Sequence, residues 1–322
     1  MKSILLLAGV LFTTSCSTTQ EFDRKILDRV HDNEVTPTTP EEGKENQKLK
    51  ITFLNVGQGD ATLIMAPNNE IILFDGGPPG AGADTIIPYL QSNNIDQLTH
   101  IIATHYHADH IGGIPEIIAG PDGQLDTYDD LIPTGFVYDR GEDQTALEQA
   151  YYPPYADATD TFHAILNPGD RIVSEDLSFE ILAVDGELID GTIIDMGDPR
   201  NENSASIATL IEYRTFTLFI GGDLTGGGID SPDVESTLAP LVGDIDILRV
   251  SHHGSRTSTN QTFLDHTKPE AAIISYGEEN DHGHPHDEVV KRLIDNGIEI
   301  HETNDGNVTI EIDSDGKHSF SQ

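Results

Sequence analysis

A short run of metal-binding residue types constrains this chain more than any other feature. The sequence THYHADH occupies residues 104–110 and directly follows the apolar run at 101–103. Three imidazoles and a carboxylate at the end of a buried strand are costly unless a cation holds them together. His105 and His107 are two residues apart and can face one side, whereas Asp109 and His110 lie one turn further on. This spacing suits two adjacent metal ions.

The ligand types in this run restrict the metal. Imidazole nitrogen and carboxylate oxygen suit Zn²⁺, or Mn²⁺ or Fe where carboxylates predominate. Gly112 and Gly113 then let the chain turn tightly into a helix that carries Ile114 and Ile117. A His-rich surface loop and a purely structural metal site are the alternative interpretations. The strand-loop-helix context favours a functional metal site.

The acidic composition restricts the kinds of partner that the chain can bind. The 322 residues contain 17 Lys plus Arg and 56 Asp plus Glu, which gives a formal net charge of -39. Such a field keeps a protein soluble and repels polyanions at long range. A basic groove for nucleic acid is therefore not evident, and a phosphate group would be held by metal ions and a few local cations. The acidity is also typical of adaptation to salt, which screens the repulsion.

The N-terminal segment differs in composition from the rest of the chain. Residues 1–15 combine a positive start with the apolar stretch Ile4–Phe12, which is too short to span a bilayer and predicts a secretory signal peptide. The TTSC sequence at 13–16 resembles a bacterial lipobox, although Thr13 stands where leucine is usual. Cys16 would then carry a lipid that anchors the protein in the cell envelope. Ordinary cleavage, which would leave a secreted or periplasmic protein, is the alternative.

One folded domain is expected over residues 50–322, after a flexible polar tether at 16–49. Short β-type runs at 51–56, 61–66 and 71–75 predict an antiparallel meander. The pattern loosens over about 120–200, which we interpret as an insertion. Its aromatic YYPPY sequence (151–155) predicts a lid that selects the substrate.

The THYHADH run resembles the signature of the metallo-β-lactamase-fold hydrolases, a family of dinuclear metal enzymes. The sequence NVGQGDA (55–61) resembles the opening of one branch, the hydrolase domain of ComEC-type competence proteins. The sequence SHHGS (251–255) resembles the last metal-binding motif of that branch. The resemblance covers about residues 50–313, without the insertion, and implies an α/β (α+β) fold, the four-layer αββα sandwich of the family.

This resemblance also implies a set of metal ligands. Two divalent ions are expected, Zn²⁺ or else Mn²⁺ or Fe, and Asp223 resembles the aspartate that bridges them. His253 is implied as a ligand of the second ion, and His252 would hydrogen-bond beside it or exchange roles with it. The full implied ligand set is His105, His107, Asp109, His110, Asp223 and His253.

Supporting residues follow from the same resemblance. Asp75 is expected to orient a ligand imidazole and to hold its tautomer, with capping of the next helix as the alternative or additional role. Many family members have a third metal-binding histidine near position 203, where this chain has Asn203. Asn203 or a water would complete the coordination of the first ion.

Three residues are expected to take part in catalysis: Asp109, His284 and Arg256. Asp109 would act at the metal ions. His284 belongs to a His-Pro step that recurs in the ComEC-type domains, and it would contact the substrate or donate a proton. Arg256 is one of the few cations near the motifs and could grip a phosphate oxygen bidentately.

The leading functional expectation is an exported phosphodiesterase that cleaves DNA or RNA with a hydroxide held between two metal ions. Alternatives are hydrolysis of a small diester such as a choline phosphate ester, and lactonase-like or β-lactamase-like hydrolysis. A surface-anchored binding module with structural metals is the alternative outside the enzymes. The expected partners are a phosphodiester substrate and a membrane, reached through the lipid on Cys16; no protein partner is inferred.

Overall fold

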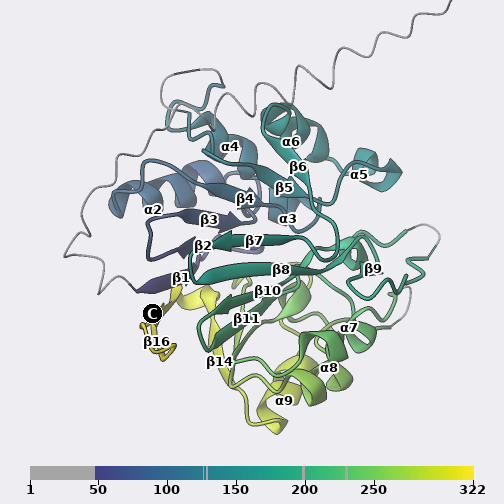
Figure 1. Cartoon of the computed structure of the whole chain (residues 1–322). Coiled ribbons are helices and arrows are strands. Elements are labelled where there is room, and N and C mark those ends of the chain that lie inside the picture. Colours follow the sequence, from purple (N-terminus) through teal and green to yellow (C-terminus); the bar gives the residue numbers. More distant parts are fainter. Residues whose placement is uncertain (1–47, 126, 128–129, 198–199, 229–230) are drawn as a thin grey trace, which may run out of the picture. The chain divides into compact units, whose positions relative to one another are not determined.

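Two mixed β-sheets lie at the centre of the domain, with helices on their outer faces (Figure 1). The computed structural model describes residues 48–125, 127, 130–197, 200–228 and 231–322. The predicted signal peptide, Cys16 and nearly all of the predicted tether lie outside the described residues. In the part of the chain that is described, no helix has the length and apolar character needed to span a membrane.

The strands of the first sheet come from both ends of the domain. They are β1 (Leu49–Phe53), β2 (Thr62–Met65), β3 (Ile71–Phe74), β4 (His100–Ile102), β5 (Val137–Asp139), β6 (His163–Ile165), β15 (Val308–Ile312) and β16 (His318–Ser321). The strands of the second sheet are β7 (Arg171–Ser174), β8 (Leu177–Val184), β9 (Glu187–Leu188), β10 (Ala208–Tyr213), β11 (Phe216–Ile220), β12 (Ile247–Arg249), β13 (Ala271–Ile274) and β14 (Glu299–Glu302).

The order of the strands brings several strand ends to one edge of each sheet. The first sheet has the order β16-β15-β1-β2-β3-β4-β5-β6, and the second has the order β14-β13-β12-β11-β10-β8-β7, with β9 paired to β8. The predicted meander is confirmed, because β1, β2 and β3 are antiparallel neighbours. Strands β3 to β6 are parallel, as are β11 to β14. Loops that follow parallel strands gather at the same sheet edge, where ligands usually bind.

The helices are short, and several have clear local causes. They are α2 (Ile87–Ser92, after a π-helical turn at Gly82–Ile86), α3 (Ala108–Ile111), α4 (Ile114–Ala119), α5 (Gln144–Glu148), α6 (Tyr152–Thr159), α7 (Glu235–Val242), α8 (Gln261–Thr267) and α9 (Asp287–Asp295). Asn260 caps α8 by accepting a hydrogen bond from the Phe263 N–H. Pro115 occupies the first turn of α4, where it costs no hydrogen bond.

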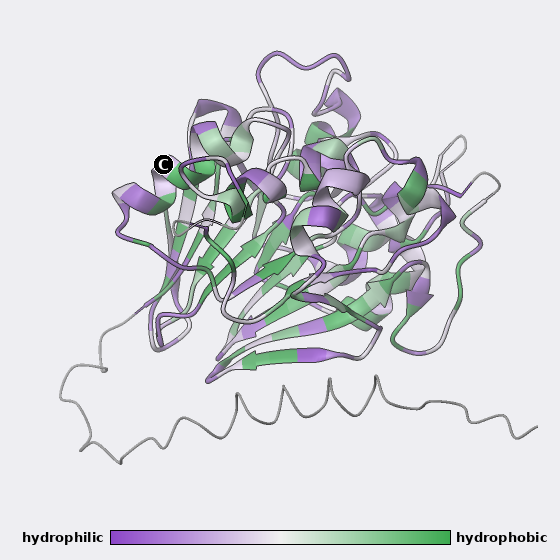
Figure 2. Ribbon diagram, turned by 90° about the horizontal axis from the view of Figure 1, so that it is seen from above, coloured by the Kyte–Doolittle hydropathy of each residue, from purple (hydrophilic) through white to green (hydrophobic). Residues whose placement is uncertain are grey.

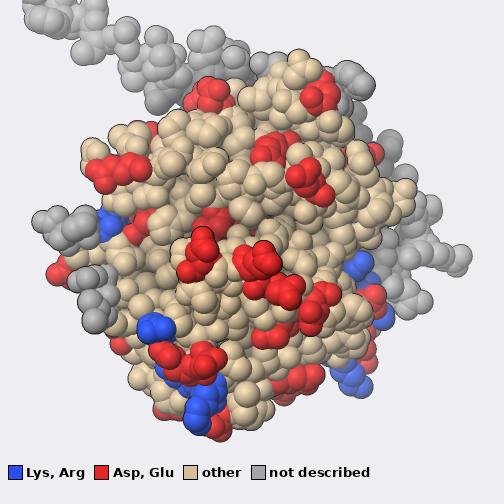
Figure 3. Space-filling model, turned by 180° about the vertical axis from the view of Figure 1, so that it is seen from behind, with Lys and Arg blue, Asp and Glu red and all other residues tan. Residues whose placement is uncertain are grey.

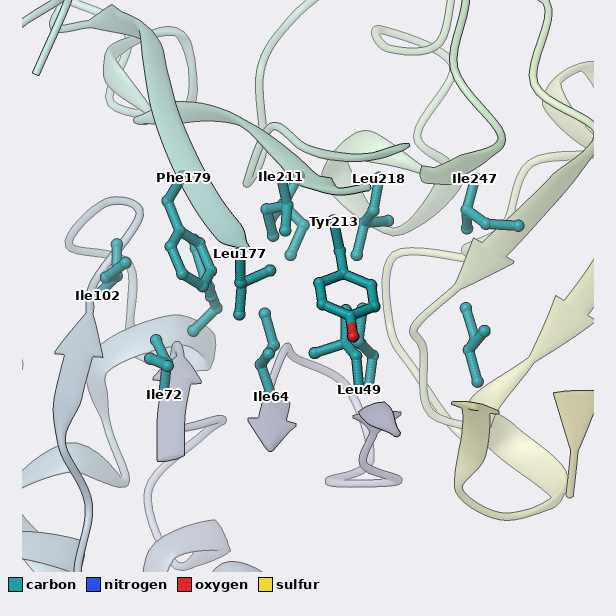
Figure 4. Close-up of a cluster of buried hydrophobic side chains, with 14 of the residues drawn as sticks. Leu49, Ile64, Ile72, Ile102, Leu177, Phe179, Ile211, Tyr213, Leu218 and Ile247 are labelled. Atoms are coloured by element: carbon teal, nitrogen blue, oxygen red, sulfur yellow. The ribbon is translucent and has the colours of Figure 1, made fainter. Parts of the chain in front are cut away.

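Three hydrophobic clusters define four layers. Side chains alternate along β3, so that Ile72 and Phe74 pack between the sheets while Ile71 and Leu73 pack against the helices beside the first sheet. Figure 4 shows the cluster between the sheets, and the third cluster joins the second sheet to α7, α8 and α9. Both faces of β3 are buried, which explains its unbroken apolar sequence IILF. Figure 2 shows that hydrophobic residues make up much of the sheets, with polar residues interspersed. The predicted αββα sandwich is confirmed.

The stretch from 120 to 200, interpreted from sequence as an insertion, contributes to both sheets. It supplies β5 and β6 to the first sheet and β7, β8 and β9 to the second. Helix α6 packs Tyr152 and Tyr155 into the cluster beside the first sheet. Much of this stretch is therefore part of the sandwich.

Candidate metal centre

The predicted metal ligands meet where strands of both sheets end. Asp75 follows β3 and the loop of residues 103–107 follows β4, whereas Asp223 and His253 follow β11 and β12. His110, in α3, connects the loops of the two sheets. Its helix follows β4 of the first sheet, and its Nε2 lies 3.3 Å from Oδ1 of Asp223, which follows β11 of the second. The topology thus brings together residues that are more than a hundred positions apart in the sequence.

The two carboxylate oxygens of Asp223 face two different groups of imidazoles. Oδ1 lies 3.3 Å from His110 Nε2 and 3.6 Å from His253 Nε2. Oδ2 lies 3.8 Å from both His105 Nε2 and His252 Nε2. A carboxylate with one oxygen toward each group is the arrangement that a bridging ligand needs.

Two further predicted ligands complete these groups. His107 Nδ1 lies 3.1 Å from His105 Nε2, so two ring nitrogens face each other and need a proton or a cation between them. Asp109 Oδ2 lies 3.2 Å from His253 Nε2. Two groups of side chains could therefore each hold a metal ion. One joins His105 and His107 to Asp223, and the other joins Asp60, His110 and His253 to Asp223.

Hydrogen bonds fix the tautomers of two ligand histidines. His110 Nδ1–H donates to Asp75 Oδ2 over 2.7 Å, and Asp75 also accepts from the Thr104 N–H and hydroxyl over 2.7 and 2.8 Å. His253 Nδ1–H donates to the Ser275 carbonyl over 2.9 Å. Each contact places a ring proton on Nδ1, so that Nε2 is the nitrogen available to bind a metal ion.

The buried atoms of the centre that lack a hydrogen-bond partner within the described chain include three that face one another: His110 Nε2, His253 Nε2 and Asp223 Oδ1. Buried polar atoms are almost always satisfied, and these three converge on one point. A divalent ion would satisfy all of them at once, and the imidazole and carboxylate donors suit Zn²⁺, Mn²⁺ or Fe. The residues present therefore fit a metal centre.

The electrostatics of the centre also favour a cation. Burial opposes charge on Asp223, but attraction to His110 and His253 holds its pKa well below the usual range. Burial and the neighbouring His110 lower the pKa of His105 well below the usual value, which keeps its ring neutral. Against the effect of burial, Asp223 and Asp75 raise the pKa of His110 well above the usual value. An ion at His110 Nε2 would displace that proton, so metal binding should release protons.

A cleft of about 450 Å³ opens over the centre. Its lining includes Asp109 and Asp223, which lie beside the ligand imidazoles. Tyr151, from the loop before α6, also lines it. His284 also lines it, and burial together with the adjacent His252 lowers the pKa of His284 to about 3. Its imidazole is therefore neutral at physiological pH, with Nδ1 buried and without a partner in the described chain.

Other predicted residues divide between the centre and the surface. Asn203 Nδ2 donates to His252 Nε2 over 3.2 Å, and both residues line the cleft. Arg256 is not among the cleft-lining residues; its side chain is 59% exposed and pairs with Glu288 over 3.5 Å. The structure therefore gives no support to the predicted contact between Arg256 and a phosphate.

Sequence reasoning missed two buried residues beneath the centre, Asp60 and Arg249. Asp60 lies in the NVGQGDA segment, whose glycines are typical of turns, and Arg249 ends β12. The two side chains form a buried ion pair. An arginine inside an apolar strand, four residues before His253, was the available signal. Gln58 and His282 also line the cleft without having been assigned to the site.

Comparison with known proteins places the whole arrangement in a family. The sequence profile of the metallo-beta-lactamase superfamily matches residues 54–278. The chain is 27% identical to ComE operon protein 3 of Bacillus subtilis over 81% of this chain and 32% of that protein. It is 31% identical to Recombination protein 2 of Haemophilus influenzae over 76% of this chain and 26% of that protein. The chain thus spans a third or less of the length of these relatives.

Solved structures share the fold at lower sequence identity. The β-hydroxylase CmlA of Streptomyces venezuelae superposes with a TM-score of 0.52 and 15% identity, covering 86% of this chain and 55% of that one. The metallo-beta-lactamase fold protein YhfI of Bacillus subtilis has a TM-score of 0.50 and 13% identity, covering 82% of this chain and 99% of that one. From the profile match, the shared fold and the clustered histidines and aspartates, we conclude that this chain belongs to the metallo-β-lactamase superfamily.

Proposed function

We propose that this protein is an exported phosphodiesterase that uses two divalent metal ions, Zn²⁺ or else Mn²⁺ or Fe. The observation that carries the proposal is Asp223, whose two oxygens each face a separate group of imidazoles at the base of an open cleft. A site that only held a structural metal would be closed, with every position occupied by protein. The resemblance of the motifs to ComEC-type hydrolase domains, together with the similarity to ComE operon protein 3 and Recombination protein 2 over most of this chain, supports a phosphodiester bond as the target.

The residues that would hold the ions are those that the structure brings together. His105 and His107 would hold one ion, Asp109, His110 and His253 the other, and Asp223 both. Such ions make water a stronger nucleophile at neutral pH and stabilise developing charge on phosphoryl oxygens.

The protein's own groups would orient the reactants. Asp75 holds the His110 ring through Nδ1, and Ser275 holds the His253 ring in the same way. His284, neutral in the cleft, carries one ring proton and can donate a hydrogen bond to a substrate oxygen. This contact would stabilise charge that develops in the transition state.

Nucleic acid is the leading substrate, as the resemblance to ComEC-type hydrolase domains implies, and a small phosphodiester is the second candidate. The second candidate is favoured by the cleft, since no Lys or Arg is among the described residues that line it. A phosphate would then be bound by the metal ions and by neutral donors such as His284, without a basic side chain. A long polyanion gains little binding free energy from a cleft without Lys or Arg, whereas a short diester needs contacts at only one phosphate group.

The test compares three substrates on the purified full-length protein reconstituted with Zn²⁺ or Mn²⁺. We expect hydrolysis of bis(p-nitrophenyl) phosphate, with little turnover of a lactone or of nitrocefin, and loss of turnover in Asp223→Ala. Asp244→Ala is the matched control, because that aspartate is 74% exposed and pairs with Lys268. Cleavage of only the lactone or of nitrocefin would contradict the proposed chemistry.

The proposed location needs its own experiment. Because the sequence at 13–16 resembles a lipobox, Cys16→Ser should move the protein from the membrane fraction to the soluble fraction of the host cells. An unchanged membrane fraction would refute anchoring through this cysteine. Release of the wild-type protein into the medium after ordinary signal cleavage would support the secreted alternative.

A further inference from the structure

Arg249 is the largest fully buried side chain among the described residues. It ends β12 and extends beneath the metal centre with a 1% exposed side chain. Its Nε donates to Asp60 Oδ1 over 3.0 Å, its Nη2 pairs with Asp60 Oδ2, and its Nη1 donates to the Gly222 carbonyl over 2.6 Å. One guanidinium thus connects the first turn of the domain with the residue next to Asp223.

Asp60 is fixed by its own backbone as well as by Arg249. The Asp60 N–H donates to the Asp109 carbonyl over 3.1 Å, and the Asp60 carbonyl accepts from the Gly77 N–H over 2.7 Å. These contacts tie Asp60 to the metal-binding loop and to the turn after Asp75. They fix the main chain of Asp60, whereas the contacts with Arg249 hold its carboxylate.

Asp60 lies close enough to His110, Asp223 and His253 to be considered a metal ligand. Two observations argue against that role. Both of its oxygens face Arg249, and its Oδ2 lies 3.7 Å from His110 Nδ1, which is the nitrogen that donates to Asp75 and not the one that faces Asp223. Asp109, whose Oδ2 faces His253 Nε2, supplies the carboxylate instead.

We infer that Asp60 and Arg249 act together as positioning residues. They hold the Gly222 carbonyl in place, and thereby keep the carboxylate of Asp223 between the two groups of imidazoles. Asp60 keeps the guanidinium in place, and Arg249 Nη1 fixes the glycine turn, where Gly222 has a φ of +54°. A buried ion pair is a weak source of stability, because its desolvation offsets the attraction. The pair would therefore contribute mainly by fixing the positions of residues at the centre, and this role does not depend on the identity of the substrate.

The decisive variant replaces the pair by apolar side chains of similar size, Asp60→Leu with Arg249→Met. Such replacements of buried ion pairs often preserve or raise stability. We expect the metal-free double variant to unfold near the wild-type temperature but to bind Zn²⁺ about 10–100-fold more weakly, as happens when supports of ligand residues are lost. Calorimetric titration and competition with a chromophoric chelator measure the affinity. The matched control makes the same substitution types at the exposed pair Arg171–Glu212, which lies away from the centre.

A second variant keeps the test decisive if the double variant does not fold. Arg249→Lys retains the charge beside Asp60, but one ammonium group cannot span both Asp60 and the Gly222 carbonyl. We expect weakened metal binding and an altered visible absorption spectrum of the Co²⁺-loaded protein. Wild-type Zn²⁺ affinity and an unchanged Co²⁺ spectrum in either folded variant would overturn the inference, because the pair would then only fill space.

Discussion

Asp75 is 2% exposed and accepts hydrogen bonds from two residues of the loop that it supports. In Asp75→Asn one acceptor oxygen becomes an NH₂ donor, which would face either the Thr104 N–H or the donors Thr104 Oγ1–H and His110 Nδ1–H. We expect metal binding to weaken by about 10–100-fold, because the His110 ring loses its fixed tautomer. Titration of the metal-free protein with Zn²⁺ measures this change.

The matched control is Asp313→Asn, which changes an aspartate that also accepts backbone hydrogen bonds but lies in a surface turn. It should leave Zn²⁺ affinity unchanged. Equal weakening in the two variants would show that general loosening of the fold, and not the orientation of His110, determines the affinity.

At the scale of an element, the turn that carries Asp60 depends on a glycine. Gly59 has a φ of +149°, and a Cβ at this position would lie 2.4 Å from the Asp109 carbonyl oxygen. Gly59→Ala should therefore displace the loop that carries Asp109, weaken metal binding and lower the free energy of unfolding by about 1–3 kcal/mol. Thermal unfolding and metal titration test both effects.

Gly57→Ala is a control that introduces backbone strain at a positive φ without a steric clash between the new Cβ and the loop that carries Asp109. Gly57 also has a positive φ, +75°, but a Cβ added at this position would have no atom within 4 Å in the described chain. This control should lose some stability and keep its Zn²⁺ affinity. Loss of Zn²⁺ affinity equal to that of Gly59→Ala would mean that the turn conformation, and not the approach to Asp109, controls the metal centre.

The junction between α7 and α8 supplies a pH-dependent contribution to stability. Glu235, which is fully buried, accepts from the Thr259 and Asn260 N–H groups over 2.8 and 2.9 Å. Burial raises its pKa to about 7, despite these hydrogen bonds. The folded state therefore binds this proton more tightly than the unfolded state does. The resulting stability is present below the usual glutamate pKa of about 4.5 and is lost as the pH rises through 7.

Glu235→Gln mimics the protonated carboxyl at every pH. Between pH 5 and 8, the free energy of unfolding of the metal-free wild type should fall relative to that of this variant by about 1–3 kcal/mol. Urea unfolding at several pH values measures the difference. Glu288→Gln, at a 53% exposed glutamate, is the control and should stay parallel to wild type. A difference that does not change with pH would contradict the raised pKa.

The elements also show what a sequence can and cannot predict here. Apolar runs predicted the meander and the strands that end at the centre, because burial on both faces leaves a continuous hydrophobic pattern. The Asp60–Arg249 pair spans 189 positions, and no local pattern links its members. Nearness in sequence to His253 suggests a place at the site for Arg256, whose side chain is 59% exposed and pairs with Glu288. Local motifs identify ligands, whereas long-range pairing determines which residues support them.

At the scale of the whole molecule, net charge dominates the encounter with a substrate. The chain carries 17 Lys plus Arg against 56 Asp plus Glu, and Figure 3 shows acidic side chains spread over one face with few basic ones. Many of the cations in the described residues already pair with carboxylates, as Lys268 does with Asp244. A polyanionic substrate must therefore approach against a repulsive field.

This repulsion predicts an unusual sign of salt dependence. Proteins that bind nucleic acid through basic surfaces lose affinity steeply as salt rises. Here salt should instead raise kcat/KM for a single-stranded oligonucleotide, because the screening length falls from about 30 Å at 0.01 M to about 3 Å at 1 M. Bis(p-nitrophenyl) phosphate carries one charge and serves as the matched substrate, whose kcat/KM should change little. The measurement is kcat/KM for both substrates across this range of NaCl at constant metal concentration. A value for the oligonucleotide that falls with salt would mean that local cations, not the overall field, govern how nucleic acid reaches the cleft.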